Sequence, residues 1–297
     1  MSFPANYSAA TASSRNEHHH HRSINGLWIS ALSWELWVQL YTDKGYRVIA
    51  ADWPGREGEI EQLRRDPSNF ASLGLADVVD HYEQLIRELE TPPIIIGHGI
   101  GGLVTQILLD RGWGAAGVAI ASAPVKGITR LPLSMLKLAF SALGNPFNKR
   151  ETTSLSPKQF HETFANTLTE AESRSAFTRY AFPGPNRVLL QTILANFTRR
   201  AATTVNARND TRAPLLLVAG GEDRVAPSSM VKANFGLYRE SKAETDYKEF
   251  PDQANFTFLQ QTKIADYVLG WALCRSNGSK LPAVANHTDG WSIQLSA

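Results

Sequence analysis

The chain has 297 residues, of which 43% are apolar and 20% are charged, and its formal net charge is +2. This balance is typical of a soluble globular protein with a sizeable core, and it gives no support for nucleic-acid binding. The single cysteine, Cys274, excludes an internal disulfide framework and favours a reducing, cytoplasmic location. No stretch approaches the roughly 18 consecutive apolar residues of a membrane span, and residues 1–22 contain no apolar signal segment.

Both ends of the chain are expected to be disordered tails. Residues 1–22 are polar and include four consecutive histidines, and residues 275–297 show no sustained hydrophobic period. The stretch before Asn25 also lacks the apolar run that a central parallel strand needs, because such a strand is buried on both faces. Either a very short strand lies there, or another sequence has replaced it.

Between the tails, apolar strands alternate with amphipathic helices. The expected strands are Tyr46–Asp52, Pro93–Gly97, Gly117–Ser122, Pro214–Gly221 and Thr245–Phe250. The expected helices are Leu75–Glu90, a helix from about Leu103 that closes on Gly112, and Thr262–Leu273. Continuous apolar strands separated by helices predict an α/β fold with a mostly parallel sheet that helices cover on both faces.

Residues 124–212 interrupt this alternation. They hold proline-rich turns and helical runs such as "SPKQFHETFANTL", in which Ser156 can cap the helix and Pro157 occupies its first position. We predict that this segment is a helical cap inserted between two strands, over the carboxyl-terminal edge of the sheet. The core would then comprise residues 23–123 and 213–274.

A glycine-rich turn links the strand that ends near Gly97 to the helix that follows it. In the nucleophile elbow, G-x-S-x-G, a serine occupies the sharp turn between a strand and a helix. The five residues here are Gly97, His98, Gly99, Ile100 and Gly101. The pattern therefore predicts an elbow whose central position carries no side chain.

Four segments resemble small, capped members of the α/β-hydrolase superfamily, over roughly residues 25–273. "NGLWISALSWELWVQLYTDKGYRVIAADWPG" is similar to the family's oxyanion loop with the helix, strand and Pro-Gly turn after it, and "GHGIGG" is similar to its GHSxGG elbow. "LLLVAGGEDRVAP" resembles the strand and loop that present the catalytic acid, and "YKEFPDQANFTF" resembles the loop that presents the catalytic histidine. The chain order also fits, so the resemblance implies the α/β-hydrolase fold with a helical cap.

The resemblance also assigns positions for catalysis. It places the acid at Asp223, the nucleophile at Gly99 and the histidine at Asn255, while Asn25 stands at the histidine position of the oxyanion loop. Serine hydrolysis needs a hydroxyl group to attack and an imidazole to transfer its proton. With both missing, ordinary serine-hydrolase activity is not expected. The groups that remain for an oxyanion or ligand site are Gly26, Leu27, Ile100 and His98.

Several of these residues also have plainer interpretations. Gly99 is the residue that best tolerates a positive φ where no nucleophile is required. His98 is either a substitute base or a side chain packed beside the sheet, and Asp223 is either the retained acid or a loop cap. The other open cases are Trp28, Trp34 and Trp37 as core or pocket residues on one helix, His161 as a surface or cavity residue, and Ser122 as a spare hydroxyl.

Three hypotheses follow for the function. The first is a non-hydrolytic enzyme of lyase, isomerase or cyclase type that acts on a small, rather apolar, carbonyl-containing metabolite. The second is a non-catalytic pseudohydrolase that binds a ligand or a partner protein. The third is a hydrolase in which a substitute base activates water directly. The first is the favoured one. No cofactor and no metal are expected, a small molecule is the expected partner, and the oligomeric state stays open.

Overall fold

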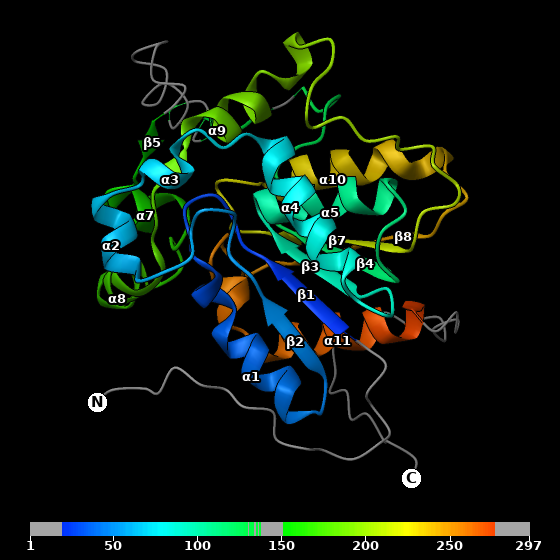
Figure 1. Ribbon diagram of the computed structural model, residues 1–297, viewed down its shortest axis with the longest axis horizontal. Coiled ribbons are helices and arrows are strands. Elements are labelled where there is room, and N and C mark those ends of the chain that lie inside the picture. Colours follow the sequence, from blue (N-terminus) through cyan, green and yellow to red (C-terminus); the bar gives the residue numbers. More distant parts are fainter. Residues whose placement is uncertain (1–19, 130, 134, 136, 138–150, 277–297) are drawn as a thin grey trace.

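A parallel sheet forms the centre of the computed structural model, which describes residues 20–129, 131–133, 135, 137 and 151–276 (Figure 1). The sheet has six strands in the order β2-β1-β3-β4-β7-β8, and all of its pairings are parallel. Its strands are β1 (His20–Ile24), β2 (Arg47–Ala50), β3 (Ile94–His98), β4 (Ala116–Ile120), β7 (Leu215–Gly220) and β8 (Thr245–Phe250). The predicted α/β fold with a mostly parallel sheet is confirmed.

Helices cover both faces of this sheet (Figure 1). One face carries α4 (Leu75–Arg87), α5 (Ile100–Asp110) and α10 (Ser228–Leu237), and the other carries α1 (Glu35–Asp43) and α11 (Thr262–Ser276). Short 3-10 turns are η1 (Ala31–Trp34), η3 (Ala195–Phe197), η4 (Tyr238–Glu240) and η5 (Thr257–Gln260). The strands β3, β4 and β7 are buried along their whole length, as expected for parallel strands between two helical layers.

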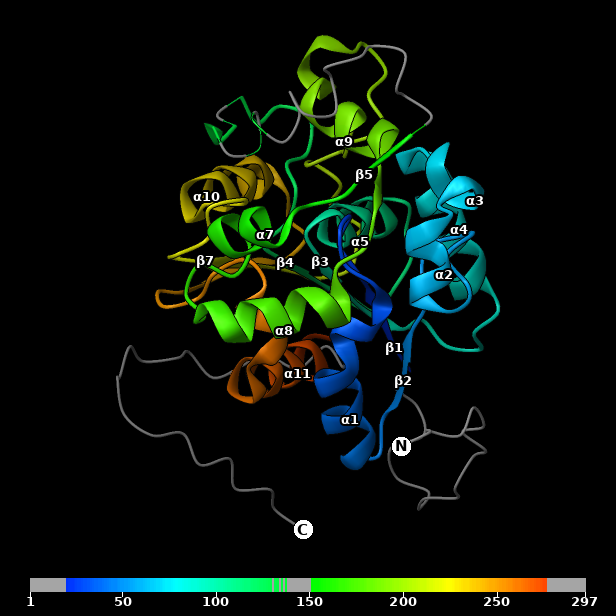
Figure 2. The ribbon, with the colours of Figure 1, turned by 90° about the vertical axis from the view of Figure 1, so that its left-hand side faces the viewer.

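The remaining elements gather at one side of the sheet, which faces the viewer in Figure 2. They are α2 (Ile60–Arg65), α3 (Ser68–Ala71), β5 (Thr152–Thr153), α7 (Pro157–Thr163), α8 (Glu170–Tyr180), β6 (Gly184–Pro185) and α9 (Asn186–Ile193). β5 and β6 form a separate antiparallel pair. The N-terminal capping of helix α7 predicted at Ser156 is present, because the amide of Gln159 donates to Ser156 Oγ at 3.2 Å. The part of the predicted cap between residues 138 and 150 lies outside the described residues.

The amino-terminal boundary predicted from sequence is wrong. Residues 20–22 are not part of a tail but begin β1, which lies between β2 and β3. Long-range contacts make burial of these polar residues possible: the His21 ring packs against Tyr41 and Tyr46, with centroids 5.4 and 5.3 Å away, and Arg22 donates to the Leu85 carbonyl at 3.0 Å. With five residues β1 is as long as β3 and β4, so the strand is neither very short nor missing, although its residues are mostly polar.

Two helix boundaries also differ from the sequence prediction. α5 begins at Ile100 rather than near Leu103, so the elbow leads directly into the helix. α11 continues to Ser276, which takes residues 275 and 276 out of the predicted tail. The rest of both predicted tails, residues 1–19 and 277–297, lies outside the described residues. None of the helices described is long and apolar enough to span a membrane.

Candidate functional site

The elbow keeps its sharp turn without a side chain at its centre. Gly99 has φ 59° and ψ −118°, a backbone conformation that is strained for residues with a Cβ. Its amide donates to the Ile120 carbonyl at 3.0 Å, and its carbonyl accepts from the Ala123 amide at 2.9 Å. Two hydrogen bonds therefore fix the turn to the end of β4. Ala121, between those two residues, itself has φ 46°.

Close packing holds the glycines on either side of this turn. A Cβ on Gly97 would lie 2.0 Å from the Gly101 carbonyl oxygen, and one on Gly101 would lie 2.1 Å from the Ile24 carbonyl oxygen. At Gly99, in contrast, the nearest atom to a Cβ would be Gly26 Cα at 3.7 Å. The central position thus has room for a side chain, although it carries none.

Asn255, at the position that the resemblance assigns to the histidine, hydrogen-bonds both to Asp223 and to His98. Asn255 Nδ2 donates to Asp223 Oδ2 at 2.9 Å, and the Asn255 backbone carbonyl accepts from His98 Nε2 at 2.8 Å. The other carboxylate oxygen, Asp223 Oδ1, accepts from the amides of Val225 and Ala226, each at 2.7 Å. Asp223 is therefore paired as an acid–base partner would be, but its partner is an amide that cannot transfer a proton near neutral pH.

Burial shifts both titratable groups of the site. Removal from water raises the pKa of Asp223 to about 6, and its three hydrogen-bond donors only partly offset this. Burial lowers the pKa of His98 to about 4, against the opposing effect of its bond to the Asn255 carbonyl. At neutral pH the imidazole is uncharged. Because Nε2 faces a carbonyl oxygen, Nε2 carries the proton and Nδ1 is left as an acceptor.

The loop after β1 forms the facing wall. Asn25 is buried, and its Nδ2 donates to the Ile29 carbonyl at 2.6 Å, so its side chain holds the turn in place. The backbone carbonyl of Asn25 accepts from Trp53 Nε1 at 3.2 Å. Gly26 follows and lies close to the elbow, since its Cα would be 3.7 Å from a Cβ added to Gly99. The loop after β1 is therefore held in a fixed turn by hydrogen bonds of Asn25.

Arg56 links this loop to Pro183 in the segment 124–212 through hydrogen bonds. Its Nη2 donates to the Leu27 carbonyl at 3.1 Å and to the Pro183 carbonyl at 3.2 Å. The guanidinium is buried among aromatic rings, with its Cζ 4.3 Å from the Trp53 centroid and 4.8 Å from that of Phe182. Burial lowers the pKa of Arg56 to about 10, so it stays charged.

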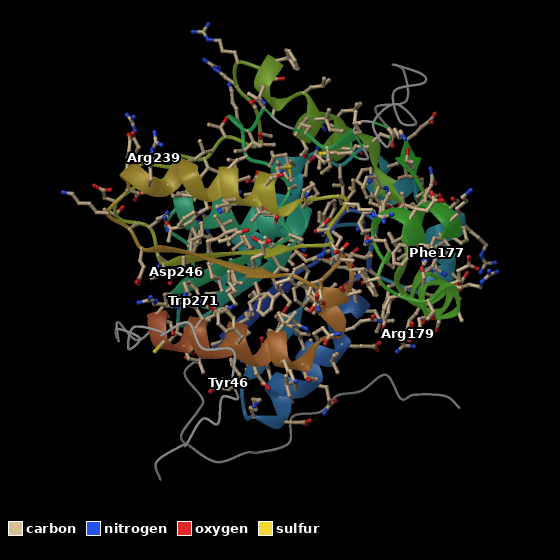
Figure 3. The ribbon with its side chains drawn as sticks, turned by 180° about the vertical axis from the view of Figure 1, so that it is seen from behind. Tyr46, Phe177, Arg179, Arg239, Asp246 and Trp271 are labelled. Atoms are coloured by element: carbon tan, nitrogen blue, oxygen red, sulfur yellow. The ribbon has the colours of Figure 1, made fainter. Side chains whose placement is uncertain are left out.

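Further contacts complete this seam. The amide of Phe182 donates to the Trp28 carbonyl at 2.8 Å, and the amide of Ser30 donates to the Tyr180 carbonyl at 3.0 Å. On the outer surface, Arg179 of α8 donates from Nε to Glu35 of α1 at 2.7 Å, at the cap side of the molecule where Figure 3 labels Arg179. The loop after β1 is thus fixed to both the core and the cap segment.

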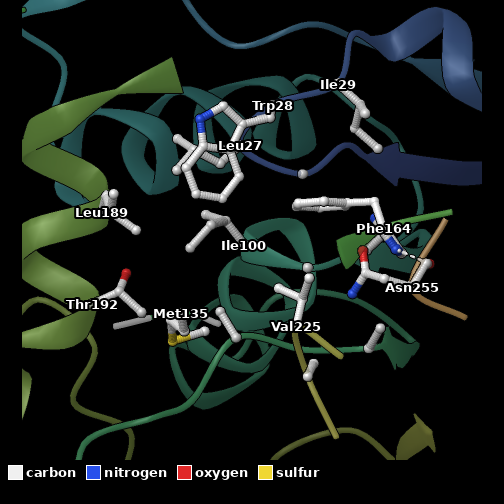
Figure 4. Close-up of a pocket in the computed structure, with 16 residues that line it drawn as sticks. Leu27, Trp28, Ile29, Ile100, Met135, Phe164, Leu189, Thr192, Val225 and Asn255 are labelled. Carbon is white, nitrogen blue, oxygen red and sulfur yellow. Dashed lines mark hydrogen bonds between the residues drawn. The ribbon is translucent and has the colours of Figure 1, made fainter. Parts of the chain in front are cut away.

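A cavity of about 50 Å³ lies between these walls (Figure 4). Most of its lining is apolar, and it draws on the loops at the carboxyl ends of the strands and on the segment 124–212. The lining residues are Gly26, Leu27, Trp28, Ile29, His98, Gly99, Ile100, Ala121, Ala123, Met135, Phe164, Leu189, Thr192, Val225, Ala226 and Asn255. The lining combines apolar walls with a few polar groups, as ligand sites do, in a volume well below the roughly 300–1,000 Å³ of a site for a drug-sized ligand.

The structure brings most of the predicted site residues together. Gly26, Leu27, His98, Gly99, Ile100 and Asn255 all line the cavity, and Asp223 lies behind Asn255. Ser122 is close by but is buried in a hydrogen-bonded chain, in which it accepts from Gln106 Nε2 and donates to the Ala123 carbonyl, each at 2.8 Å. His161 is partly buried and does not line the cavity.

The structure decides between the two interpretations left open for the tryptophans. Trp28 lies in the loop after β1, not on a helix with the other two, and lines the cavity, whereas Trp34 and Trp37 are core residues of η1 and α1. The cap residues of the lining, Phe164, Leu189 and Thr192, were not singled out. Their only signal was the spacing of three between Leu189 and Thr192 on one helical face.

Comparisons with known proteins agree with this geometry. The model of the alpha/beta hydrolase family matches residues 23–265, whereas a search of curated proteins finds no match. Among solved structures, a monoacylglycerol lipase from Paleococcus ferrophilus is 19% identical with a TM-score of 0.61, over 88% of this chain and 97% of that one. A methylesterase from Arabidopsis is 13% identical with a TM-score of 0.60, over 86% of this chain and 99% of the methylesterase. An extracellular alpha/beta-hydrolase from a Paenibacillus species is 15% identical with a TM-score of 0.60, over 87% and 98%.

At these identities the solved structures show a shared fold and nothing about activity. The family match covers most of the chain and includes the elbow, the acid loop and the loop of Asn255. This chain belongs to the α/β-hydrolase family.

Proposed function

We propose that this chain is a non-hydrolysing α/β-hydrolase whose cavity binds a small, largely apolar molecule through its carbonyl group. The observation that carries this proposal is the position of Asn255. It lines the cavity, whereas Asp223 does not, and it hydrogen-bonds the acid with an amide that cannot transfer a proton near neutral pH. The site therefore offers shape, apolar surface and hydrogen bonds, but no nucleophile and no paired base.

Hydrolysis by a substitute base fits the geometry poorly. His98 has a pKa of about 4 and uses Nε2 for the Asn255 carbonyl, so it is a weak base at neutral pH. Asp223 has a pKa of about 6 but does not line the cavity, and both of its oxygens already accept hydrogen bonds. Neither group is placed to activate a water molecule beside the elbow.

Binding of a carbonyl group is favoured by the backbone at the elbow. Ile100 is the first residue of α5 and lines the cavity. The first amides of a helix have no acceptor within the helix, and they carry the positive end of its dipole. A carbonyl oxygen placed there would accept a hydrogen bond from an amide in an apolar environment, where such a bond is strong.

Non-hydrolytic chemistry on the same carbonyl compound, of lyase, isomerase or cyclase type, is the second candidate. It is favoured by His98, which lines the cavity and whose unprotonated Nδ1 can accept a proton, although it is a weak base. It would need the carbonyl to be polarised by the Ile100 amide while His98 accepted a proton. Simple binding ranks first because a base with a pKa of about 4 gives little proton-transfer driving force at neutral pH.

The test is binding and turnover measured on the same protein. Ligand-observed NMR should show 2-butanone binding to the full chain. Leu189→Trp, which adds bulk to a cavity-lining residue, should abolish that signal, while Leu194→Trp on the exposed surface nearby should leave it unchanged. Hydrolysis of p-nitrophenyl acetate should stay at the level of heat-denatured protein, and a fluorophosphonate probe should not label any serine.

Two results would overturn this proposal. Stoichiometric fluorophosphonate labelling would mean that another serine, Ser122 first among them, acts as a nucleophile. Equal 2-butanone signals from the two tryptophan variants would mean that the ligand does not enter the cavity. Conversion of the bound ketone into a new product, without ester hydrolysis, would place the second candidate first.

A further inference from the structure

The polar side chains that line the cavity share one feature: each donates a hydrogen bond into the wall. Asn255 Nδ2 donates to Asp223 at 2.9 Å, and His98 Nε2 donates to the Asn255 carbonyl at 2.8 Å. Thr192 Oγ1 donates to the Val188 carbonyl at 2.9 Å within α9. The indole Nε1 of Trp28 donates to the Thr153 carbonyl at 3.0 Å. The four come from different elements, so the pattern does not arise from one local motif.

Asn255 and His98 each retain an acceptor atom that is not used. The carboxylate of Asp223 fixes the amide of Asn255 with its Nδ2 toward the acid, which leaves Oδ1 as an acceptor. The proton on His98 Nε2 likewise leaves Nδ1 as an acceptor. Both atoms are buried and have no hydrogen-bond partner among the described residues. A buried acceptor without a donor is costly, by about 1–3 kcal/mol.

The unpaired acceptors set this cavity apart from an anion site. Asn255 Oδ1 and His98 Nδ1 have no donor among the described residues, while the donors of the wall are the second N–H of Asn255 Nδ2 and backbone amides such as that of Ile100. The carboxyl group of Asp223, 2.9 Å from Asn255 Nδ2, has a pKa of about 6, so it is mainly ionised at neutral pH and disfavours a second negative charge nearby. A ligand suited to this wall presents a proton to Asn255 or His98 and a carbonyl oxygen to the elbow.

We infer that the cavity selects an uncharged carbonyl compound that carries a hydroxyl group close to the carbonyl, a hydroxyketone, and rejects carboxylates. This inference rests on the proposed function, because it assumes that the cavity binds a carbonyl ligand. A hydroxyl group donates one proton and so satisfies an acceptor that is otherwise unpaired. A carboxylate has no proton to donate and would lose its hydration opposite further acceptors. Sites built around a substrate hydroxyl discriminate strongly against analogues that lack it.

Three small probes of similar size test the selectivity on the full chain. Hydroxyacetone carries the hydroxyl, 2-butanone replaces that hydroxyl with a methyl group, and pyruvate supplies a carboxylate. Dissociation constants from NMR titration should be at least about tenfold lower for hydroxyacetone than for 2-butanone, with no saturable binding of pyruvate. If 2-butanone binds as tightly as hydroxyacetone, or pyruvate binds more tightly, the inference is wrong while the proposed function stands. If no probe binds, the proposed function itself fails.

A matched pair of variants locates the acceptor. Asn255→Leu removes the acceptor at nearly constant volume and should reduce the preference for hydroxyacetone over 2-butanone to less than about threefold. Asn234→Leu is the control, because Asn234 is equally buried, spends Nδ2 on Gln106 at 3.0 Å and also has an unpartnered Oδ1, but lies outside the cavity lining. It should leave the preference unchanged. An unchanged preference in folded Asn255→Leu would overturn the assignment to Asn255; should that variant not fold, the probe series on the unsubstituted chain still decides the selectivity.

Discussion

The elbow and the acid loop depart in different ways from the pattern that the resemblance to the family implies. At the elbow the side chain is gone while the backbone keeps its turn, with Gly99 at φ 59° and hydrogen-bonded at both its amide and its carbonyl. At the acid loop the side-chain hydrogen bond is kept, at 2.9 Å between Asn255 and Asp223, while the capacity to transfer a proton is gone. One region preserves geometry without a functional group, and the other preserves a contact without its function.

The difference shows what each contact is needed for. The elbow is held by close backbone approach, since the glycines that flank Gly99 leave no space for a Cβ, and this constraint persists whether or not a nucleophile is present. The acid is held by electrostatics, because a buried carboxylate needs hydrogen-bond donors and an amide supplies one as well as an imidazole does. Fold stability therefore maintains both regions without any requirement for catalysis.

The largest effect is expected where the elbow is closely packed. Gly97→Ala places a Cβ 2.0 Å from the Gly101 carbonyl oxygen, and relief requires backbone movement between β3 and α5. We expect a loss of more than about 4 kcal/mol in the free energy of unfolding, or no folded protein. Gly99→Ala has space for its Cβ and should lose only about 1–3 kcal/mol, from its positive φ. Urea denaturation of the two variants measures the contrast, and equal losses would contradict the packing argument.

The second effect is a pH dependence of opposite sign in the two regions. The pKa of Asp223 is raised in the folded state, from 3.8 to about 6, so its contribution to stability is full below about pH 4 and is lost as the pH rises toward 6. Relative to Asp223→Asn, the unsubstituted chain should lose about 3 kcal/mol across that range. The measurement is a series of urea titrations at stepped pH.

His98 should show the reverse trend. Its pKa is lowered in the folded state, from 6.5 to about 4, so its contribution is full above about pH 6.5 and is lost as the pH falls toward 4. Relative to His98→Gln, the unsubstituted chain should gain about 3 kcal/mol as the pH rises through that window. The two contributions largely cancel in the unsubstituted chain, which makes the variants necessary. Parallel slopes for the two variants would mean that one pKa shift has the wrong sign.

The same two regions show how far the sequence could be interpreted. The apolar strands and the glycine-rich turn at Gly99 were predictable, because hydrophobic runs and glycine spacing are local signals, whereas the role of Asp223 is implied only by the resemblance to the family. β1 was not, because burial of His21 and Arg22 depends on the rings of Tyr41 and Tyr46 and on a distant backbone carbonyl. The position of Thr192 in the cavity wall was not predictable either, because it depends on how α9 packs. The direction of each hydrogen-bond donor depends on partners far along the chain.

The last prediction tests whether the elbow and the acid loop are still aligned for catalysis when side chains are added at Gly99 and Asn255. Gly99→Ser should place a hydroxyl where the cavity has room for it, since a Cβ there would meet only Gly26 Cα, at 3.7 Å. Asn255→His should keep the bond to Asp223, because an imidazole N–H can replace the amide donor. Neither single change should hydrolyse p-nitrophenyl acetate above background, since a serine without a base stays a weak nucleophile and a base without a serine has nothing to activate.

The double variant should exceed the sum of the single variants by roughly 100-fold in kcat/KM, which corresponds to about 2.7 kcal/mol of transition-state stabilisation. Adding Asp223→Asn to the double variant should remove most of the gain, because the new imidazole would lose the carboxylate that orients it. The loop that carries Gly26 supplies the final requirement, a second backbone donor for the developing oxyanion. A folded double variant with no gain over either single change would place that loop, held by Asn25 and Arg56, out of register with the elbow. Such a mismatch would mean that the cavity retains the family's shape but has lost its catalytic alignment as well as its catalytic side chains.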